Sequence, residues 1–516
     1  MQEAQSPVPI VILIHPPVVK PSEPPAGLAR LSGAMKAHSL RHTLVDASLE
    51  GMLFLLEHTP VPSPDRWTAR AQKHIQRNLA LLRDPALYRS QGRYRRAVAD
   101  INRLLQAAGK SRGRLTLADY EDQGLSPQKH EDLMYAAEHP DGSVFYPYFS
   151  ARLRGLMDGC GARPMVGFSL NYLSQALATF GMVGFLRREL PEATIILGGS
   201  LVSSWSAHPG WSNPFEGLVD RIVPGPGEEV LVSMLGEKTD GRPLRPCFDG
   251  LALDQYLSPG TILPYAASTG CYWRRCSFCP EKAEGSPYSP VPFDRVTEDL
   301  RDLSLRHRPS LIHLVDNALS PGLLRHIAGN PIDAPWYGFA RFVPDLVDMD
   351  FCRSLRASGC VMLKLGLESG DQQVLDALEK GIDLEKAAGA LRSLKRAGIA
   401  TYVYLLFGTP CETHESARRT LEFVAGLSNF IDFLNVAIFN LPIHCTEART
   451  LELRPFYHGG LALYTDFVHP HGWGRRAVRT FLDKEFRKHP ALRPILLRQP
   501  PLFTSNHAPF FSMALS

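Results

Sequence analysis

Residues 271–279 read CYWRRCSFC and place three cysteines within nine positions. A disulfide uses two thiols, and a closed structural zinc site uses four ligands. No fourth cysteine or histidine follows the trio closely, because the next histidine is His307. Iron–sulfur clusters are held by cysteine thiolates, and three thiolates leave one iron of a four-iron cluster open. We therefore interpret Cys271, Cys276 and Cys279 as the ligands of a [4Fe–4S] cluster.

Alternating strand and helix patterns surround the cysteines and continue to about residue 445. Each of the first five candidate strands is followed by a helical pattern, which predicts parallel strands joined by crossover helices. We expect residues 260–445 to form a (β/α)6 partial TIM barrel, in which the chemistry takes place at the carboxyl ends of the strands. The cysteines would lie in a loop at that end of the first strand. The candidate strands are 262–268, 311–315, 336–340, 362–367, 401–407 and 433–439.

The amino-terminal part predicts a second parallel sheet. Residues 10–14 read as a buried strand, which is followed by a proline-rich loop, a helix and a strand that ends at Asp46. The same pattern returns at 165–169 and 194–197. We expect residues 1–235 to form a doubly wound, Rossmann-like α/β domain that binds its ligand at the carboxyl ends of the strands.

Three further segments complete the predicted organisation. Residues 52–163 read as a helical insertion in the amino-terminal domain, and residues 66–114 within it carry thirteen Lys or Arg against two Asp or Glu. A nucleic-acid or anionic-substrate face is one interpretation of this basic stretch, and a solvated helical face is the one we favour. Residues 236–259 read as a linker, and residues 446–516 as an irregular C-terminal extension.

Composition narrows the class of protein. Hydrophobic residues make up 44% of the 516 residues and the net charge is only +4, so the composition is that of a globular protein with no charge signature for nucleic acid. No run approaches the roughly 18 apolar residues of a membrane span, and the start lacks the basic region of a signal peptide. The nine cysteines, three of them clustered, are typical of a reducing cytoplasm. We expect a cytoplasmic protein.

The cysteine pattern resembles that of the radical S-adenosylmethionine (SAM) superfamily, in which the open iron binds SAM. CSFC at 276–279 matches the last two cysteines of the family, with the aromatic Phe278 before the third. Four residues separate Cys271 from Cys276, where the family has three. We retain all three cysteines as ligands, since a loop longer by one residue does not change their number.

Other motifs of the same superfamily follow in order. LKLGLESGD at 363–371 is similar to the G-x-E-S-G segment, in which the acidic residue holds SAM, and YLLFGTPCET at 404–413 is similar to the F-G-x-P-x-E-T turn. Asp316 and Arg341 each end a strand; the arginine could pair with the SAM carboxylate, and structural salt bridges are the alternative for both. The cofactor-binding residues that this resemblance implies are Glu368, Ser369, Arg341, Phe278, Gly408 and Asp316.

The amino-terminal domain resembles the cobalamin-binding class of the superfamily, which carries D-x-H-x-x-G, S-x-L and GG elements. DASLEG at 46–51 keeps the Asp and the Gly, but Ser48 stands where the cobalt-ligating histidine would be. A hydroxyl is a poor ligand for cobalt compared with imidazole, so we expect no histidine beneath the cobalt. The cobalamin-binding residues that the resemblance implies are Asp46, Ser48, Gly51, Ser169, Gly198 and Gly199.

These resemblances together imply a cobalamin-dependent radical SAM methyltransferase of class B, with a [4Fe–4S] cluster, SAM and cobalamin as cofactors. It would transfer a methyl group from SAM, through methylcobalamin, to an unactivated carbon of a small-molecule or peptide substrate. It would take electrons from an external flavodoxin- or ferredoxin-like donor, with no nucleic acid as partner. Rearrangement or cyclisation without methylation, polar methyl transfer, and a cobalamin-binding carrier with an inactive barrel are the alternatives.

No catalytic side chain is identified by the sequence. Cys411 and Cys445 lie at predicted strand ends and are catalytic candidates or, more usually for such cysteines, core residues. Cys352 and Cys360 fall on a predicted helix and read as structural. The tail around His507 would act as a lid over the site or as a surface strap.

Overall fold

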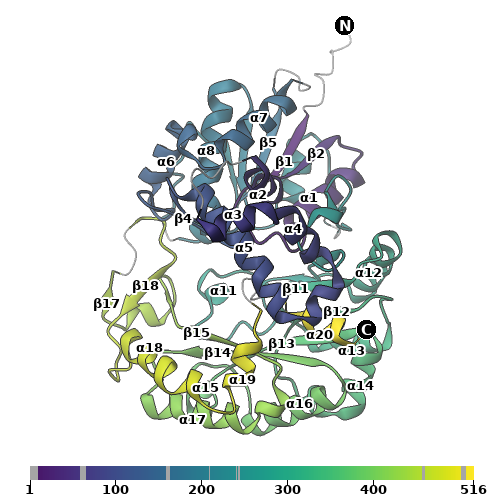
Figure 1. Cartoon of the computed structure of the whole chain (residues 1–516), viewed down its shortest axis with the longest axis vertical. Coiled ribbons are helices and arrows are strands. Elements are labelled where there is room, and N and C mark those ends of the chain that lie inside the picture. Colours follow the sequence, from purple (N-terminus) through teal and green to yellow (C-terminus); the bar gives the residue numbers. More distant parts are fainter. Residues whose placement is uncertain are drawn as a thin grey trace. The chain divides into compact units, whose positions relative to one another are not determined.

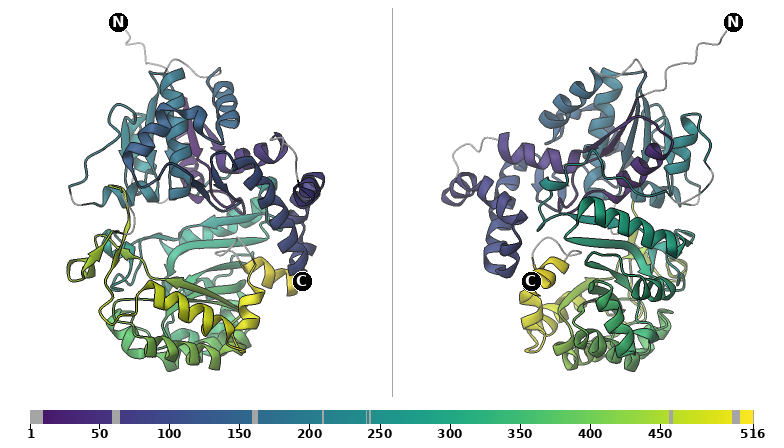
Figure 2. Two further views of the ribbon diagram at one scale, coloured as in Figure 1. Left: turned by 60° about the vertical axis from the view of Figure 1, so that its left-hand side comes forward. Right: turned by 90° about the vertical axis from the view of Figure 1, so that its right-hand side faces the viewer.

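The computed structural model describes residues 10–515 except 59–64, 159–162, 209, 240, 242–243, 456–458 and 501–506. The chain divides into two compact units (Figures 1 and 2). The first comprises residues 1–83, 96–257 and 458–462, and the second comprises 84–95, 258–457 and 463–516. In the described part of the chain, none of the helices has the length and apolar character needed to cross a membrane.

The first unit contains a five-stranded sheet in the order β2-β1-β5-β6-β7, with every neighbouring pair parallel. This order reverses between β1 and β5, which is where doubly wound folds bind their ligands. Helices α1 and α10 pack on one face of β1 through Leu28, Met35 and Val232. The strands are β1 (Val11–His15), β2 (His42–Asp46), β5 (Met165–Ser169), β6 (Thr194–Gly198) and β7 (Arg221–Val223). The helices that follow them are α1 (Ala26–Ala37), α2 (Ala47–His58), α8 (Leu173–Glu189), α9 (Ser200–Ser206) and α10 (Glu228–Met234).

The described residues between β2 and β5 form helices and one short hairpin, joined by irregular stretches. Most of the lysines and arginines of residues 66–114 are exposed, as a solvated face requires. The helices are α3 (Arg66–Lys73), α4 (Ile75–Arg83), α5 (Gln91–Gly109), α6 (His130–Glu138) and α7 (Tyr146–Met157), and the hairpin joins β3 (Gly113–Leu115) to β4 (Tyr120–Asp122).

The second unit contains a six-stranded parallel sheet in the order β15-β14-β13-β12-β11-β8. All six strands predicted between residues 260 and 445 are present, and the sheet has two edges, as a partial barrel requires. The strands are β8 (Ile262–Tyr265), β11 (Leu311–Leu319), β12 (Trp336–Ala340), β13 (Cys360–Glu368), β14 (Ala400–Phe407) and β15 (Phe433–Ile438). The helices between them are α11 (Pro280–Ala283), α12 (Phe293–His307), α13 (Pro321–Gly329), α14 (Met349–Ala357), α15 (Gln372–Ala377), α16 (Leu384–Arg396) and α17 (His414–Gly426).

The placement of Cys360 on a helix is wrong, because Cys360 begins strand β13. Gly359 separates this strand from α14 and has φ +100, a conformation that side chains rarely adopt. A Cβ at Gly359 would also lie 2.5 Å from the Ala334 carbonyl oxygen. The helix therefore ends before this glycine, and only Cys352 is helical.

The C-terminal extension is more regular than the sequence predicts. Its strands are only two to four residues long, which is too short for a sequence pattern to reveal. His507 is 1% exposed and stacks on Tyr402 of β14 at 4.3 Å, with its edge toward Phe433. Both aromatics belong to the amino-terminal halves of their strands, so His507 lies away from the carboxyl ends. The extension contains β17 (Leu453–Arg454), β18 (Tyr464–Phe467), α18 (Arg475–Lys484), α19 (Arg493–Arg498) and α20 (Ala508–Leu515), and β18 pairs with β16 (Leu441–Pro442), which precedes it.

Candidate functional site

The cysteine loop lies at the carboxyl end of β8, as predicted. Cys276 is buried, whereas Cys271 and Cys279 are half-buried. Burial raises the pKa of the Cys279 thiol, and the nearby thiols of Cys276 and Cys271 raise it further. The three thiols share one loop, and this donor set fits an iron–sulfur cluster. Among the residues the structure describes, no group of three or more His, Cys, Asp or Glu side chains has the geometry of a site for a single metal ion.

The residues between the first two cysteines are docked against the turn after α15. Trp273 Nε1 donates to the Glu379 carbonyl oxygen at 3.0 Å. A Cβ at Gly381, which has φ +63, would lie 2.2 Å from the Trp273 ring, so only glycine allows this contact. The Arg341 guanidinium carbon lies over the Trp273 ring, 4.2 Å from its centre. The longer spacing between Cys271 and Cys276 is therefore accommodated by a packed tryptophan.

Arg341 follows β12 and connects the cysteine loop to the same turn. Its Nη1 donates to Cys276 Sγ at 3.6 Å, and its Nη2 donates to the Lys380 carbonyl oxygen. Arg341 is 7% exposed and forms no ion pair with any described residue, so the alternative of a structural salt bridge does not hold here. A buried cation without a counter-ion beside a sulfur atom favours binding of an anion at this place.

Glu368 ends β13 with φ +68, a left-handed conformation that is costly for a glutamate. Its Oε1 lies 2.7 Å from Lys380 Nζ, and the two side chains are 13% and 7% exposed. Gly366 provides the space for this ion pair, because a Cβ there would lie 2.5 Å from Glu368 Oε1. Lys380 Nζ also lies 5.4 Å from the centre of the Phe278 ring. The structure thus brings Glu368, Phe278 and Arg341 together around Lys380, which the sequence did not single out.

Asp316 and Ser369 have structural partners. Asp316 accepts hydrogen bonds from Ala267 N at 3.0 Å and from Ser268 Oγ at 2.5 Å, so its carboxylate holds the chain just before the cysteine loop. Burial raises the pKa of Asp316. Ser369 Oγ lies 3.0 Å from Thr420 Oγ1 of α17 and is fully buried. Both residues position the site through the backbone around it.

The turn after β14 is held by a buried glutamate. Gly408 has φ +83, and its N–H donates to Glu412 Oε2. The same oxygen accepts a hydrogen bond from Trp473 Nε1 at 2.8 Å. Burial raises the pKa of Glu412 to about 7, and its Oε1 has no hydrogen-bond partner in the described residues. Glu412 therefore attaches the C-terminal extension to the turn that carries Gly408.

Glu412→Gln should make the free energy of unfolding less sensitive to pH. Because the folded-state pKa is raised from 4.5 to about 7, the stability that the protonated carboxyl contributes is fully present below pH 4.5 and is lost as the pH rises through about 7. Glutamine stays neutral and keeps an oxygen for Gly408 and Trp473. Urea titrations measure the free energy of unfolding at each pH. Between pH 4.5 and 8, the free energy of unfolding of the variant should rise by roughly 3 kcal/mol relative to that of the wild type.

The matched control for this prediction is Glu422→Gln, an exposed glutamate on the same part of the chain. Its stability should follow that of the wild type at every pH. Parallel curves for Glu412→Gln and the wild type would contradict the assignment of a neutral, buried carboxyl at this turn.

The remaining cysteine candidates are packed. Cys445 is 3% exposed among Phe439, Leu441 and Ala448, and burial raises the pKa of its thiol to about 11. The half-buried Cys411 has its sulfur 3.6 Å from Thr409 Oγ1. Neither thiol is activated by its surroundings.

In the first unit, the candidate residues lie at or just after the carboxyl ends of β2, β5 and β6, except Gly51. Gly51 lies within α2, where a Cβ would be 3.1 Å from the Phe145 ring. Asp46 Oδ1 accepts hydrogen bonds from Ser48 N at 3.1 Å and Leu49 N at 3.0 Å, and Oδ2 accepts one from Tyr256 at 2.6 Å. Ser48 Oγ accepts from Val19 N at 2.8 Å and donates to the Val19 carbonyl oxygen at 3.0 Å. Both bonding roles of this hydroxyl are thus used within the loop after β1.

The other residues of this group lie at the ends of β5 and β6. Gly199 has φ +111, and a Cβ there would lie 2.3 Å from the Leu170 carbonyl oxygen. Ser169 and Gly198 are the last residues of neighbouring strands and are paired in register. His15 ends β1 beside them, and burial lowers its pKa. His15 is not among the residues predicted from the sequence. It directly follows the predicted strand 10–14, and this position would have indicated a place at the edge of the sheet where the ligand binds.

A known protein family matches the part of the chain that contains the cysteine loop and the strand ends described above. Residues 265–424 match the Radical SAM superfamily. This span includes the cysteine loop, Arg341, Glu368 and Gly408. The resemblance to this superfamily that the motifs predict is therefore confirmed for residues 265–424.

Curated relatives share part of the chain. It is 24% identical over 203 residues to an uncharacterized methyltransferase of Pyrococcus horikoshii, covering 37% of this chain and 43% of that protein. It is 27% identical over 279 residues to the hopanoid C-3 methylase of Methylococcus capsulatus, covering 47% and 52%. The chain spans about half the length of these relatives.

Two solved structures have a similar fold. The radical SAM methyltransferase TsrM of Kitasatospora setae, with cobalamin and a [4Fe–4S] cluster bound, has a TM-score of 0.51 at 16% identity and covers 84% of this chain and 76% of that one. The cobalamin-dependent SAM radical enzyme OxsB has a TM-score of 0.58 at 13% identity and covers 92% and 67%. The predicted fold class is confirmed by these similarities and by the two parallel sheets.

Proposed function

We propose that this chain, whose residues 265–424 form a radical SAM domain, is a cobalamin-dependent radical SAM methyltransferase. It would transfer a methyl group from SAM, through cobalamin, to an unactivated carbon of its substrate. The observation that carries the proposal is the group formed by Cys276, Arg341, Lys380 and Glu368 at the carboxyl ends of the strands. Similar solved proteins with cobalamin and an iron–sulfur cluster support the cofactor set.

Cys271, Cys276 and Cys279 would hold the cluster, which when bound supplies the electron that cleaves SAM. Arg341 would donate to the Cys276 sulfur and so favour the reduced cluster, because hydrogen bonds to the sulfur atoms raise its potential. Glu368 would bind SAM, and in the structure its carboxylate is already oriented by Lys380. Arg341 contacts the Cys276 sulfur and Lys380 orients Glu368. Arg341 also donates a hydrogen bond to the Lys380 carbonyl oxygen, which connects the two contacts. The electron would come from a flavodoxin- or ferredoxin-like donor.

Cobalamin would bind at the edge formed by Asp46, Ser169, Gly198 and Gly199. Glycine at 199 lets the turn after β6 pack against the Leu170 backbone, and the carboxyl ends of β1 and β5 are where this fold accepts a ligand. Cobalamin supplies the methyl carrier, and the chain supplies orientation and the exclusion of water.

In the cob(II)alamin form of the protein, we expect that residue 48 supplies no nitrogen ligand to the cobalt, because it is a serine. The Ser48 hydroxyl forms two hydrogen bonds with the Val19 backbone. It is therefore not expected to ligate cobalt, and no histidine is present at this position to do so. The EPR spectrum of the reconstituted protein should show no strong nitrogen hyperfine coupling. A spectrum with strong nitrogen splitting would contradict this prediction.

The experiment that tests the function is an analysis of the products from SAM. The full chain is reconstituted anaerobically with iron, sulfide and cobalamin, and is incubated with SAM, a reductant and candidate substrates. A methyltransferase of this type yields 5′-deoxyadenosine and S-adenosylhomocysteine together. Formation of 5′-deoxyadenosine alone would establish a rearrangement or cyclisation, and formation of S-adenosylhomocysteine alone would establish polar methyl transfer.

A further inference from the structure

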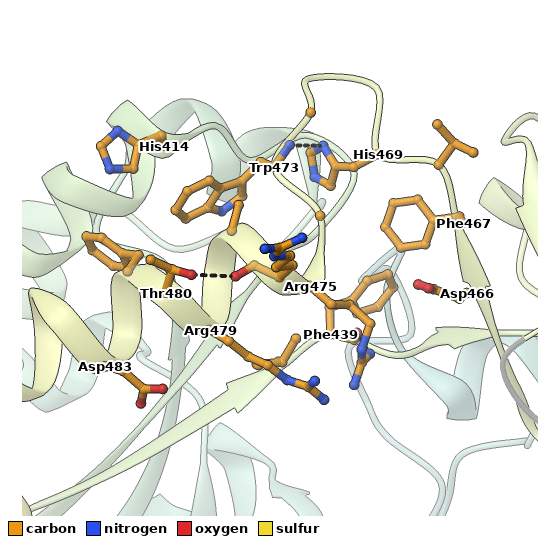
Figure 3. A pocket seen from close by; sticks show the side chains of 18 of the residues that line it. His414, Phe439, Asp466, Phe467, His469, Trp473, Arg475, Arg479, Thr480 and Asp483 are labelled. Carbon is orange, nitrogen blue, oxygen red and sulfur yellow. Dashed lines mark hydrogen bonds between the residues drawn. The ribbon is translucent and has the colours of Figure 1, made fainter.

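A pocket of about 1250 Å³ lies in the second unit, between helix α18, strand β18 and the ends of β14 and β15. Figure 3 shows Arg475 and Arg479 on α18 and the aromatic rings of Phe439 and Phe467 nearby. Gly408, from the turn that Glu412 holds, also lines the pocket. The volume is sufficient for a small-molecule ligand.

The apolar wall of the pocket is continuous with the packing around the cysteine loop. Phe439 and Phe467 both line the pocket and belong to one cluster of packed side chains. Phe278, which stands between Cys276 and Cys279, packs against the same cluster. The pocket wall is therefore connected to the cysteine loop through one set of packed side chains.

The polar lining of the pocket carries an excess of positive charge. The guanidinium groups of Arg454, Arg476 and Arg479 form no hydrogen bond or ion pair with the residues described here. Arg476 and Arg479 lie three positions apart on α18, where two like charges repel each other. Arg475 differs, because its Nη1 donates to the Phe439 carbonyl oxygen at 3.0 Å and to Asn440 Oδ1 at 2.8 Å.

Most carboxylates of the lining already have partners. Asp483 pairs with Arg487, and Glu485 lies 3.7 Å from His414 Nε2. Asp466 stands opposite Arg454 in the register of β17 and β18, but no ion pair joins them. The arginines are therefore not neutralised within the pocket.

We propose that this pocket binds an amphipathic anion, in which a carboxylate or phosphate contacts Arg476 and Arg479 and an apolar body contacts Phe439 and Phe467. Guanidinium groups bind both kinds of anion through paired N–H donors, and an anion removes the repulsion between the two arginines. The inference rests on the proposed function only in taking this anion to be the methyl acceptor.

The test uses three probes with one apolar body: 2-naphthoate, 2-naphthyl phosphate and the neutral 2-naphthamide. Titration calorimetry on the full chain should show at least one anion binding about tenfold more tightly than the amide, as expected for a charge-assisted contact. The better anion identifies the head group. Arg476→Met combined with Arg479→Met should abolish this preference and leave binding of the amide unchanged.

Arg493→Met is the matched control, because Arg493 is an exposed arginine of the same unit outside the pocket. It should bind all three probes as the wild type does. Equal affinity of the wild type for the anions and the amide, or an undiminished preference in the double variant, would overturn the proposal.

These measurements need neither the cluster nor SAM, so they are independent of the product analysis. Binding of the anion without any cleavage of SAM would contradict the proposed function and leave the pocket established. Cleavage of SAM without a preference for the anions would overturn the pocket and leave the proposed function standing.

Discussion

Cys276→Ala is expected to lose the iron–sulfur cluster after anaerobic reconstitution of the full chain. The wild type should hold about four iron and four sulfide per chain. Two remaining thiolates cannot hold such a cluster, and the variant also removes the sulfur to which Arg341 donates. Iron and sulfide analysis, together with the absorbance of the cluster, measures the loss.

Cys445→Ala provides the matched control, because Cys445 is a buried cysteine of the same unit outside the motif. It should lower stability through the lost packing, by on the order of 1 kcal/mol, and keep the cluster. Wild-type iron content in Cys276→Ala would refute the assignment of the ligands.

Gly366→Ala is expected to weaken the binding of SAM at least about tenfold without unfolding the chain. The new Cβ would lie 2.5 Å from Glu368 Oε1 and 2.9 Å from Lys380 Nζ, so the ion pair must move. Alanine is compatible with the backbone at this position, since Gly366 does not have a positive φ. A displaced Glu368 would lose its charge-assisted contact with SAM, and such a contact contributes roughly 1.5–3 kcal/mol. Equilibrium dialysis with labelled SAM on the reconstituted protein measures the affinity.

Gly426→Ala is the control for this substitution. Gly426 is the last residue of α17, and a Cβ there would meet nothing within 4 Å. Its affinity for SAM should equal that of the wild type. The same affinity in Gly366→Ala would show that the Glu368 carboxylate does not hold SAM.

The parts of the molecule that could be predicted are those written in local sequence patterns. The six strands of the second unit are buried runs with helices between them, and each is present. The three cysteines share one loop, and Glu368 ends a strand, so their common edge follows from a parallel sheet alone. Asp46 and Gly199 could be placed at strand ends for the same reason.

The parts that could not be predicted depend on contacts between distant residues. Lys380 lies twelve positions after Glu368 in a turn, and nothing in the local pattern shows that its ammonium returns to the carboxylate. Trp473 meets Glu412 across sixty-one positions. The role of Trp273 also becomes visible only through its contacts with Gly381 and Arg341, which are more than sixty positions away in the sequence.

The two departures from the family motifs have different physical explanations. The extra residue between Cys271 and Cys276 is accommodated by the contacts of Trp273. Ser48 has a structural role, because its hydroxyl connects the start of α2 to the Val19 backbone through two hydrogen bonds. Neither departure removes a residue that the proposed reaction requires.

The measurement that tests the central claim most directly is electron–nuclear double resonance of the reduced, reconstituted chain with SAM that carries 15N in its amino group. Three protein thiolates leave one iron open, and SAM should bind it through its amino and carboxylate groups. We predict a hyperfine coupling between the cluster and the 15N nucleus. A reduced cluster that shows no 15N coupling at saturating SAM would contradict the account.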